Sequence, residues 1–147
     1  MKNDSHHILF RLPEKKDAQA VRRLIEDSPP LDLNSLYCYL LLCTHFAPTS
    51  AIAEYHQEVC GFVSAYIRPD QKDTLFVWQV AVQRDFRGKS IAKGMLLSCL
   101  QRAHLSSLRY LETTVNPSNS SSDALFSSLA EFLNAGLAKS ALFSADD

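Results

Sequence analysis

The chain has 147 residues, of which 46% are hydrophobic and 21% charged, and its formal net charge is −1. This length and composition fit one globular domain, so we expect a single domain over residues 1–147. A net charge near zero provides no field that would attract nucleic acid or an anionic membrane. No apolar run reaches the roughly 20 residues of a membrane span, and the N-terminus lacks the apolar segment of a signal peptide. We therefore expect a soluble cytoplasmic protein that binds neither nucleic acid nor membrane.

The cysteines and histidines predict no metal site. Cys38, Cys43, Cys60 and Cys99 form no Cys-x-x-Cys pair and lie in apolar stretches, as buried thiols of a reducing compartment do. The five histidines show no metal-ligand spacing.

The first half of the chain predicts a strand over residues 8–12 and a helix over 14–27, which the prolines at 29 and 30 end. A second helix follows over 34–46, with Asn34 or Asp32 as its cap. It contains no charged residue, so we expect it to be buried on most sides. It belongs to the core, or it lines a pocket or a dimer contact. The hydroxyls of Tyr37 and Tyr39 favour the pocket.

The second half predicts a sheet. Residues 50–55 and 59–67 form a hairpin, 68–73 a polar loop, and 75–82 a strand so apolar that we expect both its faces to be covered. A helix over 90–103, a strand over 108–115 and a helix over 122–133 follow. Strand, helix and strand of these lengths predict a right-handed parallel crossover. The predicted fold is an α/β (α+β) mixed sheet, with antiparallel strands, then a parallel crossover, and helices on both faces.

The segment after the apolar strand predicts an anion site. It is polar, contains one glycine and carries Arg84, Arg87 and Lys89, and a helix begins directly behind it. Free N–H groups and the positive end of the helix dipole attract phosphate at such a place. The alternative is an ordinary solvated loop.

Residues Arg87-Gly88-Lys89-Ser90-Ile91-Ala92 resemble the pyrophosphate-binding motif of the GNAT acetyltransferases, Arg/Gln-x-x-Gly-x-Gly/Ala, with Ser90 where the family has glycine. The resemblance implies a GNAT sheet with two parallel strands that splay apart. It implies acetyl-CoA as cosubstrate, with the pantetheine arm on the main chain of Val80 and Val82. The implied cofactor contacts are Val80, Val82, Arg87, Gly88, Lys89, Ser90, Ala92, Asn119 and Phe126.

Two positions depart from the family pattern. Many GNAT enzymes carry a tyrosine after an asparagine as general acid, whereas the pattern that starts at Asn119 reaches Phe126, which has no proton to give. After Ala135 twelve residues remain, and we expect the last strands of a GNAT sheet to be lacking.

Three further segments, residues 31–37, 75–82 and 111–115, resemble the diaminobutyrate acetyltransferases, which act before ectoine synthase. This resemblance implies transfer of an acetyl group to the 4-amino group of L-2,4-diaminobutyrate, in a homodimer that serves osmoprotection. Asp32, Tyr37 and Trp78 are the candidate substrate contacts, and Tyr37 and Glu112 the candidate catalytic residues.

Each of these side chains has an ordinary structural alternative. Asp32 can cap a helix, Glu112 can face solvent and Trp78 can belong to the core. The alternatives for the chain as a whole are a non-catalytic acyl-CoA-binding or assembly domain and a GNAT acetyltransferase for another small amine.

Overall fold

The computed structural model describes residues 7–140, 142 and 143. The chain divides into two compact units, Met1–Glu112 and Thr113–Asp147. The helices and strands of the first unit are β1 (Ile8–Arg11), η2 (Lys15–Asp17), α1 (Ala18–Glu26), α2 (Leu36–Leu42), η3 (Ala47–Thr49), β2 (Ala51–Tyr55), β3 (Glu58–Arg68), β4 (Gln71–Val82), η4 (Arg84–Phe86), α3 (Ile91–Leu100) and η5 (Ala103–Leu105). Strand β5 (Tyr110–Thr113) ends where the second unit begins, and the second unit contains α4 (Ser120–Phe132).

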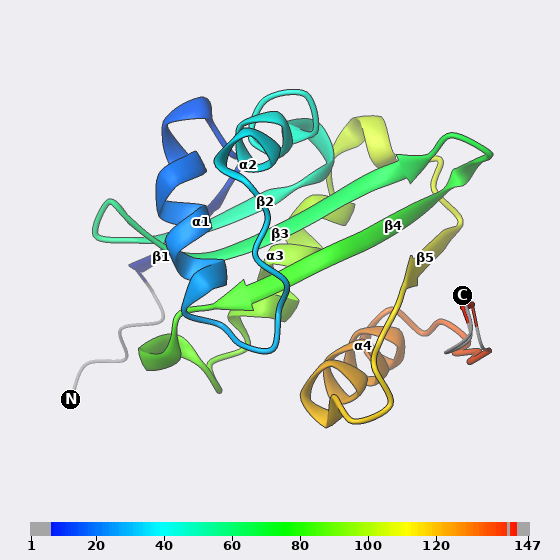
Figure 1. Ribbon diagram of the computed structural model, residues 1–147. Helices are drawn as coiled ribbons and strands as arrows, with labels where there is room; N and C mark the ends of the chain where they lie inside the picture. Colours follow the sequence, from blue (N-terminus) through cyan, green and yellow to red (C-terminus); the bar gives the residue numbers. More distant parts are fainter. Residues whose placement is uncertain (1–6, 141, 144–147) are drawn as a thin grey trace. The chain divides into compact units, whose positions relative to one another are not determined.

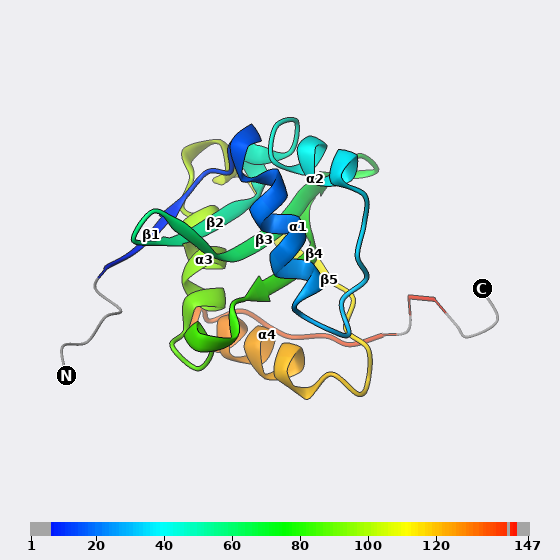
Figure 2. The same cartoon turned by 60° about the vertical axis from the view of Figure 1, so that its left-hand side comes forward.

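The five strands form one mixed sheet in the order β1-β2-β3-β4-β5, and this confirms the predicted fold class. The first four strands pair antiparallel with their neighbours, and β5 lies beside β4 after the α3 crossover. Helices α1 and α2 cover one face and α3 the other (Figure 1, Figure 2). None of the helices in the described residues is long and apolar enough to span a membrane.

Two cores hold these layers together. On one face, Val21 and Ile25 of α1 and Tyr39 of α2 belong to one buried cluster with Phe62 and Ala81 of the sheet. On the other face, α3 packs so closely that the ring of Phe10 occupies the place where a side chain on Gly94 would lie. Burial of this apolar surface is the main stabilising contribution, at roughly 25 cal/mol per Å².

The two hairpins follow from their turns. His56 and Gln57 have φ angles of 48° and 68°, the left-handed conformation that a two-residue type I′ turn requires. The second hairpin is longer than predicted, because Arg68 already pairs with Gln71. The predicted polar loop over 68–73 is therefore wrong except at its tip. Its polar side chains are tolerated because the strand ends extend into solvent.

Helix α2 also differs from the prediction. It is capped by Ser35, whose side chain accepts a hydrogen bond from the N–H of Cys38, and not by Asn34 or Asp32. Asn34 Nδ2 is instead buried without a partner among the described residues. The helix buries Tyr39 and Leu42, whereas Tyr37 is 69% exposed, so the expectation of burial on most sides is wrong within the single chain. In the described residues after α4, no strand forms.

Candidate active site

The basic turn before α3 is exposed and has an unusual backbone. Gly88 and Ser90 have φ angles of 77° and 60°, and all residues from Arg87 to Ser90 are exposed. Ser90 is the N-cap of α3, but its side chain makes no capping hydrogen bond. The N-terminal end of the helix dipole therefore faces solvent at a place that an anion can reach.

Two of the three basic side chains stay at this turn. Arg87 donates a hydrogen bond from Nε to the carbonyl of Val82 over 3.0 Å, a bond that does not use its two terminal nitrogens. The Nζ atom of Lys89 lies 5.7 Å from the centre of the Phe86 ring. Arg84 instead lines a groove that α1 borders. Arg87 and Lys89 are thus the side chains that can meet a phosphate here.

Strand β4 contains a bulge at Trp78. The register shifts because Gln79 pairs with Ser64, whereas Val77 pairs with the next residue, Ala65. The N–H of Gln79 donates to the buried hydroxyl of Ser64 over 3.0 Å, which satisfies a main-chain donor beside the bulge. Trp78 itself is 44% exposed, so the expectation that both faces of this strand are covered is wrong, and Trp78 is not a core residue.

The far half of β4 extends beyond its parallel neighbour. The N–H of Arg109, just before β5, donates to the carbonyl of Asp73 over 2.8 Å, which aligns the start of β5 with the first third of β4. Because β5 has only four residues, it ends before Val80 and Val82. Both valines are half-buried, and they lie in the part of β4 that extends beyond β5.

The loop between α1 and α2 carries one candidate acceptor residue, Asp32, and α2 carries another, Tyr37. The main-chain carbonyl of Asp32 accepts a hydrogen bond from Gln79 Nε2 over 2.8 Å, so Asp32 lies beside β4 next to Trp78. The Asp32 side chain is exposed and caps no helix. Tyr37, in the first turn of α2, is exposed as well. The main chain of Asp32 is therefore bonded to the residue next to Trp78, although the two segments lie far apart in the sequence.

Glu112 on β5 is held by an arginine that no sequence pattern singles out. Arg68, at the end of β3, reaches across β4 and donates from Nη1 to both carboxylate oxygens of Glu112, each over 3.0 Å. Its Nε and Nη2 bind Asp70 over 3.0 and 2.6 Å. This hydrogen bond with Asp70 raises the pKa of Arg68 and lowers that of Asp70. Glu112 is thus part of an ion pair and not a freely solvated side chain.

The remaining candidates, Asn119 and Phe126, belong to the second unit. Asn119 is the N-cap of α4, and its side chain accepts a hydrogen bond from the N–H of Ser122 over 3.1 Å. Phe126 lies one and a half turns into the same helix and is half-buried.

Comparisons with known proteins agree with this geometry. Residues 18–132 match the acetyltransferase (GNAT) family. The chain belongs to this family. It is 46% identical to an L-2,4-diaminobutyric acid acetyltransferase of Vibrio parahaemolyticus (82% of this chain, 67% of that one) and 48% identical to one of Bordetella parapertussis (82% and 66%). The chain thus spans about two thirds of the length of these relatives.

Solved structures show the same relationship. The diaminobutyrate acetyltransferase EctA from Paenibacillus lautus, solved with L-2,4-diaminobutyric acid and coenzyme A, superposes with a TM-score of 0.84 at 44% identity, over 86% of this chain and 76% of that one. The aminoglycoside N-acetyltransferase AAC(6')-Iy superposes with a TM-score of 0.74 at 19% identity, over 94% and 93%, and shares the fold alone.

The cysteines of this GNAT chain do not provide a nucleophile. Burial raises the pKa of the Cys43 thiol to about 12 and that of Cys60 to about 11, and it raises those of Cys38 and Cys99 as well. A thiol that stays protonated at neutral pH attacks a thioester poorly. A covalent acetyl-cysteine intermediate is therefore disfavoured. In the described residues, no group of His, Cys, Asp and Glu could hold a metal ion.

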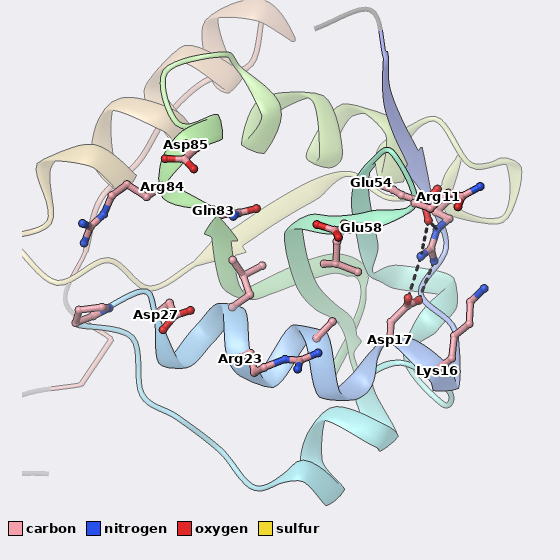
Figure 3. Close-up of a pocket in the computed structure, with 15 residues that line it drawn as sticks. Arg11, Lys16, Asp17, Arg23, Asp27, Glu54, Glu58, Gln83, Arg84 and Asp85 are labelled. Carbon is pink, nitrogen blue, oxygen red and sulfur yellow. Dashed lines mark hydrogen bonds and ion pairs between the residues drawn. The ribbon is translucent and has the colours of Figure 1, made fainter. Parts of the chain in front are cut away.

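The first unit also has a large open groove. This open groove of about 1310 Å³ lies between α1, the β2–β3 turn and the segment after β4, and none of the candidate acceptor residues lines it (Figure 3). Arg11 there donates two hydrogen bonds of 2.8 Å to Asp17 and two, of 3.2 and 3.3 Å, to Glu54 Oε1. Burial alone would raise the pKa of Asp17, but the bonds from Arg11 and from the N–H of Glu14 outweigh it and lower that pKa. These satisfied ion pairs hold β1, β2 and α1 together.

The sequence analysis did not identify two residues that hold the candidate side chains, Arg68 and Gln79. Gln79 had a usable signal, because it is the only hydrogen-bonding side chain besides Trp78 in the apolar run 75–82, and a buried amide needs partners. Arg68 had none, because its partner Glu112 is 44 residues away.

Proposed function

We propose that this chain transfers the acetyl group of acetyl-CoA to the 4-amino group of L-2,4-diaminobutyrate, giving N4-acetyl-L-2,4-diaminobutyrate for ectoine biosynthesis. The observation that carries the proposal is the similarity to EctA from Paenibacillus lautus, which was solved with both diaminobutyric acid and coenzyme A. The exposed basic turn and the part of β4 that extends beyond β5 support it independently.

For the cosubstrate, we propose that the turn from Arg87 to Ala92 binds the pyrophosphate. Its contacts would be the guanidinium of Arg87, the ammonium of Lys89 and main-chain N–H groups at Gly88, Ser90 and Ala92. Charge-assisted hydrogen bonds of this kind are the strong ones. The main chain of Val80 and Val82 would hold the pantetheine arm, and Asn119 and Phe126 remain proposed contacts from α4.

For the acceptor, we propose that Asp32 and Trp78 bind the α-ammonium group. The carboxylate of Asp32 pairs with its charge, and the exposed ring of Trp78 attracts it through the ring quadrupole. The hydroxyl of Tyr37 donates a hydrogen bond to the acceptor's carboxylate. With the α-amine held, only the 4-amine is free to approach the thioester.

The reaction requires the 4-amine in its neutral form, because the amine nitrogen supplies the electron pair. That nitrogen forms a bond to the thioester carbonyl carbon, the carbon–sulfur bond breaks, and sulfur leaves as thiolate with its electron pair. The amine gives up a proton in the process and the thiolate takes one up. We propose Glu112 and Tyr37 as the groups that handle the amine proton, with Arg68 holding the Glu112 carboxylate towards the site.

We also propose that the protein acts in the cytoplasm, as a homodimer and in osmoprotection, and that both units form one domain. The free cysteines support a reducing compartment, and the family match across residues 18–132 supports a single domain.

Release of coenzyme A tests the proposal. Acetyl-CoA is incubated with the protein, with and without L-2,4-diaminobutyrate, and free coenzyme A is separated by chromatography because protein thiols react with colorimetric reagents. The proposal predicts release that depends on diaminobutyrate. Binding of acetyl-CoA without such release would favour the non-catalytic alternative, and release with other small amines alone would favour a different acceptor.

A further inference from the structure

A buried amide joins the central strand to the loop that carries Asp32. Gln79 lies on β4 next to Trp78 and is only 4% exposed. Its Nε2 donates to the carbonyl of Asp32 over 2.8 Å, and its Oε1 accepts a hydrogen bond from the hydroxyl of Tyr39 over 3.2 Å. That hydroxyl in turn accepts from the N–H of Asn34 over 3.3 Å. We call these four bonded groups the Gln79–Tyr39 network.

The network satisfies its buried polar side chains. Tyr39 is fully buried, and both polar atoms of the Gln79 side chain have partners. A buried amide or hydroxyl without a partner is costly, whereas a connected network is rigid and holds one arrangement. Such a network therefore fixes the elements that it joins: the side chains of β4 and α2 on one side, and the main chain of the loop on the other.

The loop depends on this network because it has no regular structure of its own. Residues 32–35 belong to no helix or strand. The main chain is held at the carbonyl of Asp32 by Gln79 and at the N–H of Asn34 by Tyr39. The position of Asp32 relative to Trp78 is thus set by the side chain of Gln79, the residue that follows Trp78 in the chain.

We propose that Gln79 and Tyr39 are positioning residues that set the acceptor length this enzyme selects. The inference rests on the proposed function, since it assumes that Asp32 and Trp78 hold the acceptor's α-ammonium. With their separation fixed, the distance from the ammonium site to the thioester is fixed as well. An acceptor with the correct number of carbons places its terminal amine at the carbonyl, and one with an extra methylene does not.

Two variants loosen the loop with little loss of packing. Tyr39→Phe keeps the buried ring and removes only the hydroxyl, which leaves the N–H of Asn34 and Gln79 Oε1 without that partner. Gln79→Glu keeps the size of the side chain and the acceptor for Tyr39, but it removes the donor to the carbonyl of Asp32. Ser50→Ala is the matched control, because its fully buried hydroxyl accepts a hydrogen bond from the N–H of Ala65 and bonds no member of the Gln79–Tyr39 network.

The experiment measures kcat and KM for diaminobutyrate, ornithine and acetyl-CoA, together with the melting temperature. In both loop variants the KM for diaminobutyrate should rise about fivefold or more, the scale of one lost hydrogen bond. The kcat/KM ratio of diaminobutyrate to ornithine should fall by a similar factor, because one methylene is worth roughly 10–200-fold in a well-fitted pocket. The KM for acetyl-CoA should not change, and Ser50→Ala should lower the melting temperature without altering the ratio.

The outcomes separate the two proposals. Suppose that the wild-type protein acetylates diaminobutyrate. The inference is then overturned, and the proposed function stands, if the loop variants keep the wild-type kcat/KM ratio of diaminobutyrate to ornithine. The same holds if their KM values for diaminobutyrate and for acetyl-CoA rise together. A wild-type protein that does not acetylate diaminobutyrate at all would overturn both. If Tyr39→Phe fails to fold, Gln79→Glu alone decides between these results.

Discussion

Ser90 stands where GNAT enzymes have glycine, and its replacement has two separable effects. Its φ of 60° lies in the left-handed region, which costs a residue with a Cβ about 1–2 kcal/mol. Ser90→Gly removes that cost but gives the unfolded chain more freedom, about 0.4–1 kcal/mol. The net gain in the free energy of unfolding is thus roughly 0.5–1 kcal/mol, or about 2–3 °C in melting temperature for a domain of this size. The exposed hydroxyl, which caps no helix, is free to donate to a phosphate, and its loss should raise the Kd for coenzyme A about fivefold.

Calorimetry and thermal melts of three variants test this reasoning. Ser90→Gly should melt at a higher temperature yet bind coenzyme A more weakly. Ser90→Ala keeps the Cβ and the strained backbone, so its affinity should fall equally while its stability stays that of wild type. Gln57→Gly, at another exposed position with positive φ, is the control and should change stability alone. A higher affinity in Ser90→Gly would mean that the side chain crowds the phosphate, and an unchanged affinity in Ser90→Ala would exclude the hydroxyl as a donor.

Arg87→Ala should weaken coenzyme A binding by about 1.5–3 kcal/mol, the value of a hydrogen bond to a charged group, and unchanged affinity in calorimetry would remove Arg87 from the site. Asp32→Asn and Trp78→Leu should each weaken acceptor binding by about 1–3 kcal/mol while the Kd for acetyl-CoA stays within about twofold. Equal losses for both ligands, with a lower melting temperature, would contradict this. Asp17→Asn should lower the free energy of unfolding by about 3 kcal/mol at pH 7, because it leaves Arg11 partly unpaired. Since the pKa of Asp17 is below its ordinary 3.8 in the folded protein, this contribution is present above that pH and is lost as the pH falls further. Urea unfolding at pH 7 and near pH 2 measures it, and a difference that persists in acid would refute the assignment.

Local features of the fold were predictable from the sequence. The strand, basic turn and helix around Arg87 follow from composition and spacing within one continuous segment. The error at β4 has a clear cause. Apart from Gln79, the run from Leu75 to Val82 is apolar, so its composition does not show which side chains face solvent, and the bulge that leaves Trp78 exposed is not visible in it. The cap of α2 was placed at Asn34 or Asp32 and not at Ser35, because all three are good capping residues and only the backbone decides between them.

The site was predictable only in part, for a physical reason. Periodicity and motif spacing act within one element, whereas the bonds that orient the candidate residues join distant segments. Glu112 is held by Arg68 across 44 residues, and the carbonyl of Asp32 by Gln79 across 47. The resemblance to a family supplied the candidate residues, but it did not supply the side chains that hold them in place.

The position of the transferred acetyl group tests the central claim most directly. L-2,4-diaminobutyrate and acetyl-CoA labelled in the acetyl group are converted by the protein, and the product is analysed by NMR for a coupling between the labelled carbonyl and an amide proton. The account predicts that this amide proton belongs to the 4-amino group, next to the terminal methylene, and that the α-ammonium stays unmodified. A product acetylated at the α-amine, or a mixture of the two, would contradict an acceptor site in which Asp32 and Trp78 hold the α-ammonium.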